Sequence, residues 1–172
     1  KNLKKINTQE DILYNNILSL SRNKLFYTKF ALADTFQNRI YLIFLHISFL
    51  FIKIKHNDRK KIYRIFYQKM FNLIFNNIEL NMREIGYGDT VINKNMKFLV
   101  KTFYNILLNC ENFNESNLDF KKMFFLKHLT YSNMGKEADN VPLIDYFDKY
   151  QAFCIDLSID SVLKGNLNFK YK

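Results

Sequence analysis

The chain has 172 residues, 48% of them hydrophobic, with four glycines, one proline and a formal net charge of +10. This length is typical of one domain with a sizeable core, and so few helix-breaking residues argue against a sheet-rich fold with many tight turns. The sequence therefore predicts an all-α fold, a single-domain compact helical bundle of about six helices that spans residues 1–172. An excess of positive charge is typical of proteins that meet an acidic partner, such as RNA or an anionic membrane.

Apolar residues recur at helical spacing along most of the chain. The second expected helix is apolar nearly all round, so it belongs at the centre of the bundle, and Asp34 with Gln37 resembles a capping box at its start. Its most apolar part, 40–52, is too short for the ~20 residues of a membrane span and is expected to be a buried core helix. Asn57 or Asp58 is expected to cap the third helix. The expected helices cover residues 9–22, 36–55, 58–84, 92–112, 116–131 and 141–164, and the basic tail, 166–172, is expected to be frayed or extended.

Two of the four glycines lie between the third and fourth expected helices, where residues 83–90 read Arg-Glu-Ile-Gly-Tyr-Gly-Asp-Thr. Gly86 can take the left-handed conformation that ends a helix. Asp89 can accept backbone N–H groups where the next helix begins. The pattern predicts a helix–turn–helix joint.

A longer stretch around this joint resembles the signature of the ubiquinol–cytochrome c chaperone family, whose members assist assembly of the cytochrome bc1 complex. It runs from Asn81 to Thr90 and is followed by a Lys-x-Met-Lys segment, 94–97, and a Phe-Tyr pair, 103–104. The two blocks that carry the resemblance cover roughly residues 14–113. The upstream block comprises Ser21-Arg22, Phe26-Tyr27, Ala33-Asp34-Thr35, Asn38-Arg39 and Leu45-His46, with Ala33 where the family usually has Pro and Asn38 where it usually has Gly.

The resemblance implies an assembly chaperone of the respiratory chain, not an enzyme, with newly made cytochrome b as its client. In mitochondrial relatives this role goes with binding near the ribosomal tunnel exit and with a small partner protein. It implies a location peripheral to the inner membrane, on the cytoplasmic side in a bacterium and on the matrix side in a mitochondrion. No DNA partner, no cofactor and no metal ion are expected, and no secretory signal is expected at the N-terminus.

The charged and glycine residues of the two blocks are the candidates for binding a client or partner protein. The charged ones are predicted to form one polar cluster, because the resemblance places both blocks in the same family core and their charges are opposite. If these residues are partly buried, they must pair. The candidates are Asp34, Arg39, Arg83, Glu84, Gly86, Gly88 and Asp89.

A second candidate surface is a run of basic residues with Asp58 as its one acidic member. A solvated helix face explains such a run, and the alternative is a contact surface for RNA or for the headgroups of an anionic membrane. Part of the charge reflects the AT-rich codons of an abundant residue, lysine. The run comprises Lys53, Lys55, Arg59, Lys60, Lys61, Arg64 and Lys69.

Other residue types that often carry chemistry lack a convincing arrangement. The histidines at 46, 56 and 128 have no metal-ligand spacing to one another or to either cysteine. His46 is expected to be a hydrogen-bonded core residue, and Cys110 and Cys154 are expected to be reduced, buried thiols. Asp145 and Asp148 form one Asp-x-x-Asp pair without the second acidic cluster that a magnesium-diphosphate enzyme would need.

The alternative functions are a small all-helical enzyme that acts on a lipid or isoprenoid, and a basic RNA-binding module. An enzyme would show a pocket of several hundred cubic ångströms lined by converging carboxylates. A chaperone would show a shallow apolar groove beside a basic face.

Overall fold

The computed structural model describes residues 7–56, 58–132 and 139–172, and these residues form eight α-helices without a β-strand. An isolated antiparallel bridge joins Leu32 to Tyr131. Six of the helices have eleven residues or more, which confirms the predicted all-α bundle of about six helices. The helices are α1 (Gln9–Ser21), α2 (Leu25–Thr28), α3 (Phe36–Lys55), α4 (Lys60–Ile85), α5 (Asp89–Glu111), α6 (Leu118–His128), α7 (Val141–Asp156) and α8 (Ile159–Leu163).

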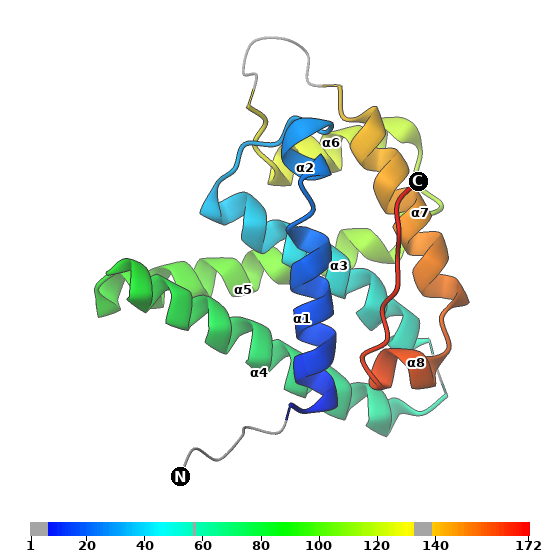
Figure 1. Ribbon diagram of the computed structural model, residues 1–172, viewed down its shortest axis with the longest axis horizontal. Coiled ribbons are helices and arrows are strands. Elements are labelled where there is room, and N and C mark those ends of the chain that lie inside the picture. Colours follow the sequence, from blue (N-terminus) through cyan, green and yellow to red (C-terminus); the bar gives the residue numbers. More distant parts are fainter. Residues whose placement is uncertain (1–6, 57, 133–138) are drawn as a thin grey trace.

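Helix α3 is the centre of the bundle (Figure 1) and packs against α1, α4, α5, α7 and α8. Every residue from 40 to 51 is buried. Within the described ranges, α3 is the one helix whose length and apolar composition would suffice to cross a membrane, but 78% of that window is buried inside the protein. The prediction of a buried core helix is confirmed.

The buried polar groups of α3 have partners inside the bundle. His46 lies within hydrogen-bond distance of the Leu42 carbonyl through Nδ1 and of the Tyr146 hydroxyl through Nε2. Burial lowers the pKa of His46 to about 4. The prediction that His46 is a hydrogen-bonded core residue is therefore confirmed. Cys110 and Cys154 are free and buried, as predicted.

Helices α4 and α5 form a long hairpin whose arms diverge from the joint at the left of Figure 1. Both arms pack against α3, and α1 crosses α4. The buried stripe of α4 is Phe66, Met70, Ile74, Phe75, Ile78 and Met82, and that of α5 is Ile92, Leu99, Thr102, Phe103, Ile106 and Cys110. These two stripes confirm the helical spacing of the apolar residues in the sequence, and the opposite face of each arm is exposed.

Helix starts differ in detail from the expected ones. At α3 the Thr35 side chain, not that of Asp34, accepts the hydrogen bond from the Asn38 backbone N–H at 3.1 Å. At α4 the capping position is Arg59, without a side-chain cap, so the expected cap by Asp58 is wrong. Asn57 lies outside the described residues.

The C-terminal part also differs. The helix expected over 116–131 ends at His128 because the following residues pair with the segment before α3, where the Ala33 N–H donates to the Thr130 carbonyl at 2.9 Å. Asn38 in the first turn of α3 also accepts from the Thr130 N–H and donates to the Thr130 carbonyl. The helix expected over 141–164 is two helices, because Leu157 is extended and Ser158 caps α8.

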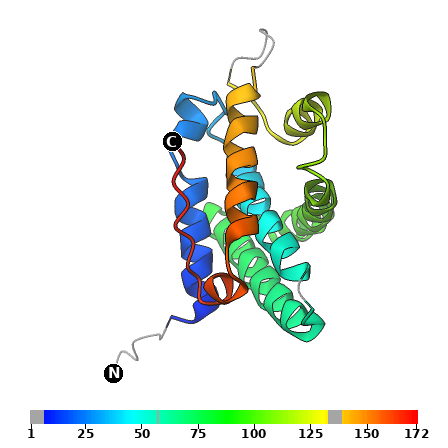
Figure 2. The ribbon, with the colours of Figure 1, turned by 90° about the vertical axis from the view of Figure 1, so that its right-hand side faces the viewer.

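The C-terminal tail is extended and docked along α7 (Figure 2), not frayed. Its start is fixed by Asn16, which donates to the Gly165 carbonyl at 2.6 Å. Its end is fixed by the Tyr171 hydroxyl, which donates to the Asp145 carboxylate at 2.8 Å. Asp148, the other member of the Asp-x-x-Asp pair, binds Lys121 at 2.8 Å. Both carboxylates therefore hold the scaffold together.

Candidate functional site

The joint between α4 and α5 is closed by a left-handed glycine. Gly86 has φ +101°, and the Tyr87 N–H donates to the Met82 carbonyl at 3.1 Å across the end of the helix. Gly88 has φ −73°, which any residue can adopt, and caps α5 through its backbone. Asp89 is the first residue of α5 and does not cap it with its side chain, contrary to expectation. The predicted helix–turn–helix joint is confirmed.

An ion-pair group ties the two arms of the hairpin together near this joint. Arg83 donates to Asp89 in the first turn of α5 and to Glu79 one turn earlier in α4. These hydrogen bonds, chiefly the one to Asp89 and then the one to Glu79, raise the pKa of Arg83. All three side chains are exposed, so the group orients the joint without being buried.

A second ion pair lies before α3. Arg39 binds the Asp34 carboxylate at 2.7 Å, and both side chains are more than half exposed. The hydrogen bond that Arg39 donates to Asp34 raises the pKa of Arg39. The predicted single polar cluster is therefore wrong: Asp34 pairs with Arg39 and Asp89 pairs with Arg83 in two separate exposed groups, and Glu84 belongs to neither pair.

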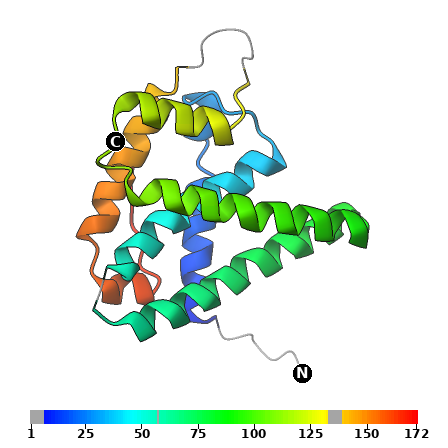
Figure 3. The same ribbon diagram turned by 180° about the vertical axis from the view of Figure 1, so that it is seen from behind.

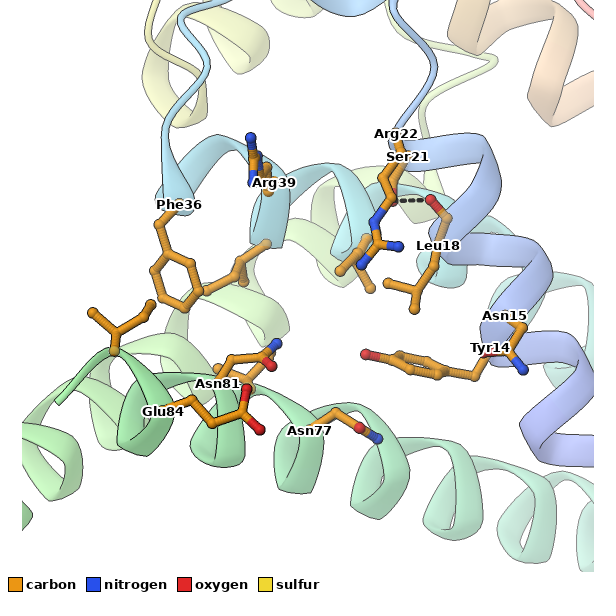
Figure 4. Close-up of a pocket in the computed structure, with 14 residues that line it drawn as sticks. Tyr14, Asn15, Leu18, Ser21, Arg22, Phe36, Arg39, Asn77, Asn81 and Glu84 are labelled. Atoms are coloured by element: carbon orange, nitrogen blue, oxygen red, sulfur yellow. Dashed lines mark hydrogen bonds between the residues drawn. The ribbon is translucent and has the colours of Figure 1, made fainter. Parts of the chain in front are cut away.

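A polar cavity of about 560 Å³ lies between α1, α3 and α4 (Figure 4). Arg22 at the end of α1 and Arg39 on α3 line one wall, and Glu84 on α4 lines the facing wall with two amide side chains, Asn77 and Asn81. The Tyr14 hydroxyl points into the cavity from α1 (Figure 4), and burial raises its pKa. Arg39 and Glu84 are thus the two predicted residues that face a common space.

An apolar groove of about 190 Å³ lies on the other side of the first turn of α3. Phe36 and Ile40 line both the cavity and the groove. The far wall of the groove includes Tyr87 of the joint and Phe98 of α5, which are 43% and 59% exposed. We call this cavity and groove the α3–α4–α5 site.

The apolar residues of this site were not among the sequence-based candidates. Helical spacing in the sequence indicates that Phe98 is exposed, because it lies outside the inward stripe that contains Leu99 and Phe103. Tyr87 lies between the two motif glycines. Phe36 gives no such signal, because an apolar residue in the first turn of an apolar helix is expected to face the core.

Three members of the basic run bind elsewhere in the fold. Lys53 donates to the Ile155 carbonyl, Lys55 binds Glu111 at 2.7 Å and Lys69 binds Glu10 at 3.5 Å. Lys55 and Lys69 are nevertheless exposed, as are Arg59, Lys60, Lys61 and Arg64 at the start of α4. The hydrogen bond that Lys55 donates to Glu111 raises the pKa of Lys55. The ion pairs with Glu111 and Glu10 therefore make the positive charge of this surface smaller than the sequence predicts.

The carboxylates of the site do not converge. Among the described residues that line the polar cavity, Glu84 is the single carboxylate, and two arginines, Arg22 and Arg39, line the same cavity. The described parts of the chain hold no group of three histidine, cysteine or acidic side chains suited to a metal ion. In the part of the chain that the structure describes, the site thus lacks the converging carboxylates expected of an enzyme. It contains the apolar groove expected of a chaperone, beside a cavity with charge of both signs instead of a basic face.

Comparison with known proteins identifies the family. The model of the ubiquinol-cytochrome C chaperone family matches residues 28–118. The chain belongs to this family. The matched segment contains every motif candidate from Asp34 to Asp89, and it also contains the basic run.

The fold is shared with a solved structure of similar size. The crystal structure of the Cbp3 homolog from Brucella abortus superposes with a TM-score of 0.79 at 19% sequence identity, covering 95% of this chain and 89% of that one. No curated protein matches the chain. The family points to a chaperone role, and the solved structure shows that the fold is shared.

Proposed function

We propose that the protein is an assembly chaperone that binds newly made cytochrome b before it enters the cytochrome bc1 complex. The observation that carries the proposal is the α3–α4–α5 site, whose apolar groove lies wholly inside the family-matched segment and whose cavity is completed by α1. An unassembled membrane protein exposes apolar helices flanked by polar residues, and such a client needs both kinds of surface from its partner. The groove offers apolar contacts, and the adjoining cavity offers charge of both signs.

The neighbourhood of the groove supports a binding role. Tyr87 and Phe98 leave large aromatic surfaces in water, and Ile85 beside the joint is 58% exposed. Exposed apolar groups that rim a concave surface are typical of protein interaction sites. The rigid scaffold beneath them, α3 packed on both arms of the hairpin, holds the groove open.

Further partners belong to the same proposal. We propose that the exposed basic residues at the start of α4 contact ribosomal RNA, which would bring the chaperone to cytochrome b as it is made. A small partner protein and a location at the inner membrane surface fit this role, on the cytoplasmic side in a bacterium or the matrix side in a mitochondrion.

Site-specific crosslinking tests the client site. A photoreactive phenylalanine analogue is placed at Phe98 or Tyr87 in the full chain, and at Ile155 as a control, an exposed apolar residue at the end of α7. Cytochrome b translated in the presence of each variant is expected to crosslink from 98 and 87 and not from 155. Because all three positions are exposed, the substitutions leave the core intact.

Two outcomes would contradict the proposal. Crosslinking from 155 as strong as from 98 would mean that contact with the groove is not specific. Equal crosslinking to an unrelated membrane protein of similar length would mean that the protein is a general holdase instead of a cytochrome b chaperone.

A further inference from the structure

Helix α5 exposes a continuous stripe on the side that faces away from α3. Its members recur every three or four residues, so they share one side of the helix. The stripe alternates ammonium groups with large apolar side chains: Lys94, Lys97, Phe98, Lys101, Tyr104 and Leu108, all exposed.

Helix α6 exposes a second apolar stripe. Phe120, Met123 and Leu126 follow one another at three-residue spacing and are 40%, 67% and 46% exposed. Lys127 is exposed on the same side and Lys122 is half-buried at its edge. The inward residues of α6 pack toward α7, so this stripe has no covering element among the described residues.

The two helices lie on the same side of the molecule. Figure 3, which views the protein from behind, shows α5 and α6 in front of the rest of the chain, and Figure 2 shows both at the same edge. We call this surface the α5–α6 face. It carries Leu108 and Met123, which at 64% and 67% are the most exposed large apolar side chains of the described residues.

The charge of the α5–α6 face is mostly positive. Its five lysines, at 94, 97, 101, 122 and 127, form no ion pair within the described parts of the chain. Asp119, four residues before Met123, adds a negative charge to the α6 stripe itself, and the exposed Glu115 lies before α6. Lysine stems cover apolar surface while their ammonium groups reach outward, so the charges can ring the apolar groups.

We propose that the α5–α6 face docks on the surface of an anionic lipid bilayer, with Leu108 and Met123 inserted between the headgroups. Apolar side chains flanked by lysines are the combination that binds this interface, since insertion and attraction to lipid phosphates add. The basic run at the start of α4 lacks this combination of lysines and apolar side chains, because Ile65 is its one large exposed apolar residue. The inference does not depend on the client, since Leu108 and Met123 line neither the polar cavity nor the apolar groove, although Phe98 borders both surfaces.

Tryptophan reporters test insertion directly, because the natural chain has no tryptophan. Leu108→Trp and Met123→Trp place single reporters on the face, and Ile65→Trp is the matched control on the basic run. With phosphatidylcholine vesicles that contain phosphatidylglycerol, emission at 108 and 123 is expected to shift to the blue and to be quenched by brominated acyl chains. Emission at 65 is expected to stay unchanged.

Charge variants test the electrostatic part. Lys97→Ser with Lys101→Ser is expected to lower partitioning into these vesicles about thirtyfold, given about 1 kcal/mol for each lysine near the surface. The matched change Lys60→Ser with Lys61→Ser is expected to have a much smaller effect. Circular dichroism checks that each variant is folded.

Three results would overturn the proposal. Reporters at 108 and 123 that stay exposed while the protein pellets with vesicles would assign binding to another surface. An equal loss of vesicle binding in the two double-lysine variants would mean that binding depends only on the net charge of the protein. If the protein does not bind these vesicles at low salt, the partner of the α5–α6 face is not a lipid surface, and an acidic protein is the alternative.

Discussion

At the scale of single residues, His46 has the most constrained environment. A carbonyl only accepts, so Nδ1 donates to Leu42 at 2.6 Å, and Nε2 then accepts from the Tyr146 hydroxyl at 2.7 Å. The Tyr150 hydroxyl donates to the His46 carbonyl at 2.7 Å. A proton on Nε2 would remove its acceptor and place a charge in the core, which is why burial lowers the pKa of His46 to about 4.

We expect the free energy of unfolding to decrease as the pH falls from about 6.5 toward 4. In this range the unfolded chain binds a proton that the folded chain refuses, so stability is lost on acidification, by up to roughly 3 kcal/mol. His128 contributes in the same direction, because burial lowers its pKa to about 4 as well. Urea unfolding at several pH values measures the dependence. His46→Gln is expected to weaken the pH dependence of the free energy of unfolding, and His56→Gln is the exposed control, expected to keep it. The same pH dependence in His46→Gln as in the wild type would contradict the role given to His46.

At the scale of elements, the α4–α5 joint relies on one of its two glycines. Gly86 adopts φ +101°, whereas Gly88 has ordinary extended geometry. An added Cβ would meet no atom within 4 Å at either position, so backbone conformation alone separates the two.

Gly86→Ala is therefore expected to destabilise the protein by about 1–2 kcal/mol, the cost of a left-handed residue with a Cβ. Gly88→Ala is the matched control and is expected to change stability by less than about 1 kcal/mol, with a slight gain because alanine restricts the unfolded chain. Thermal unfolding of the two variants measures the difference. Equal melting temperatures would mean that the joint rearranges to relieve the strain.

At the scale of the whole molecule, positive charge is divided between two surfaces. Most of the exposed part of the basic run lies at the start of α4, and the α5–α6 face lies along the back of the bundle (Figure 3). Only the second surface combines lysines with several exposed apolar side chains. The two are therefore suited to different partners, RNA and lipid.

Changing Lys60, Lys61 and Arg64 to Ser is expected to weaken binding to ribosomes and to flatten its salt dependence. Each lost phosphate contact changes the log–log slope by about 0.7 to 0.9. Co-sedimentation with ribosomes at low and moderate salt measures this, and Lys97→Ser with Lys101→Ser is the control that should retain ribosome binding. If wild type and the triple variant pellet equally at both salts, the run is only a solvated helix face.

Helical spacing in the sequence is local information, and it predicted the all-α bundle, the buried α3, the joint at Gly86 and the core role of His46. The family followed from ordered motifs, which are also local. Helix ends were less predictable: Thr35 and Asp34 are both good caps, and Leu157 interrupts an apolar pattern that continues on both sides.

Only the tertiary structure decided which charges meet. Lys55 pairs with Glu111 and Lys69 with Glu10, partners more than fifty positions away, and Arg39 faces Glu84 across a cavity instead of joining one cluster with Arg83. The physical reason is that helix rotation and crossing are fixed by packing of the whole core. A sequence sets which residues share one face of a helix, but packing sets which faces oppose each other and which remain open to a partner.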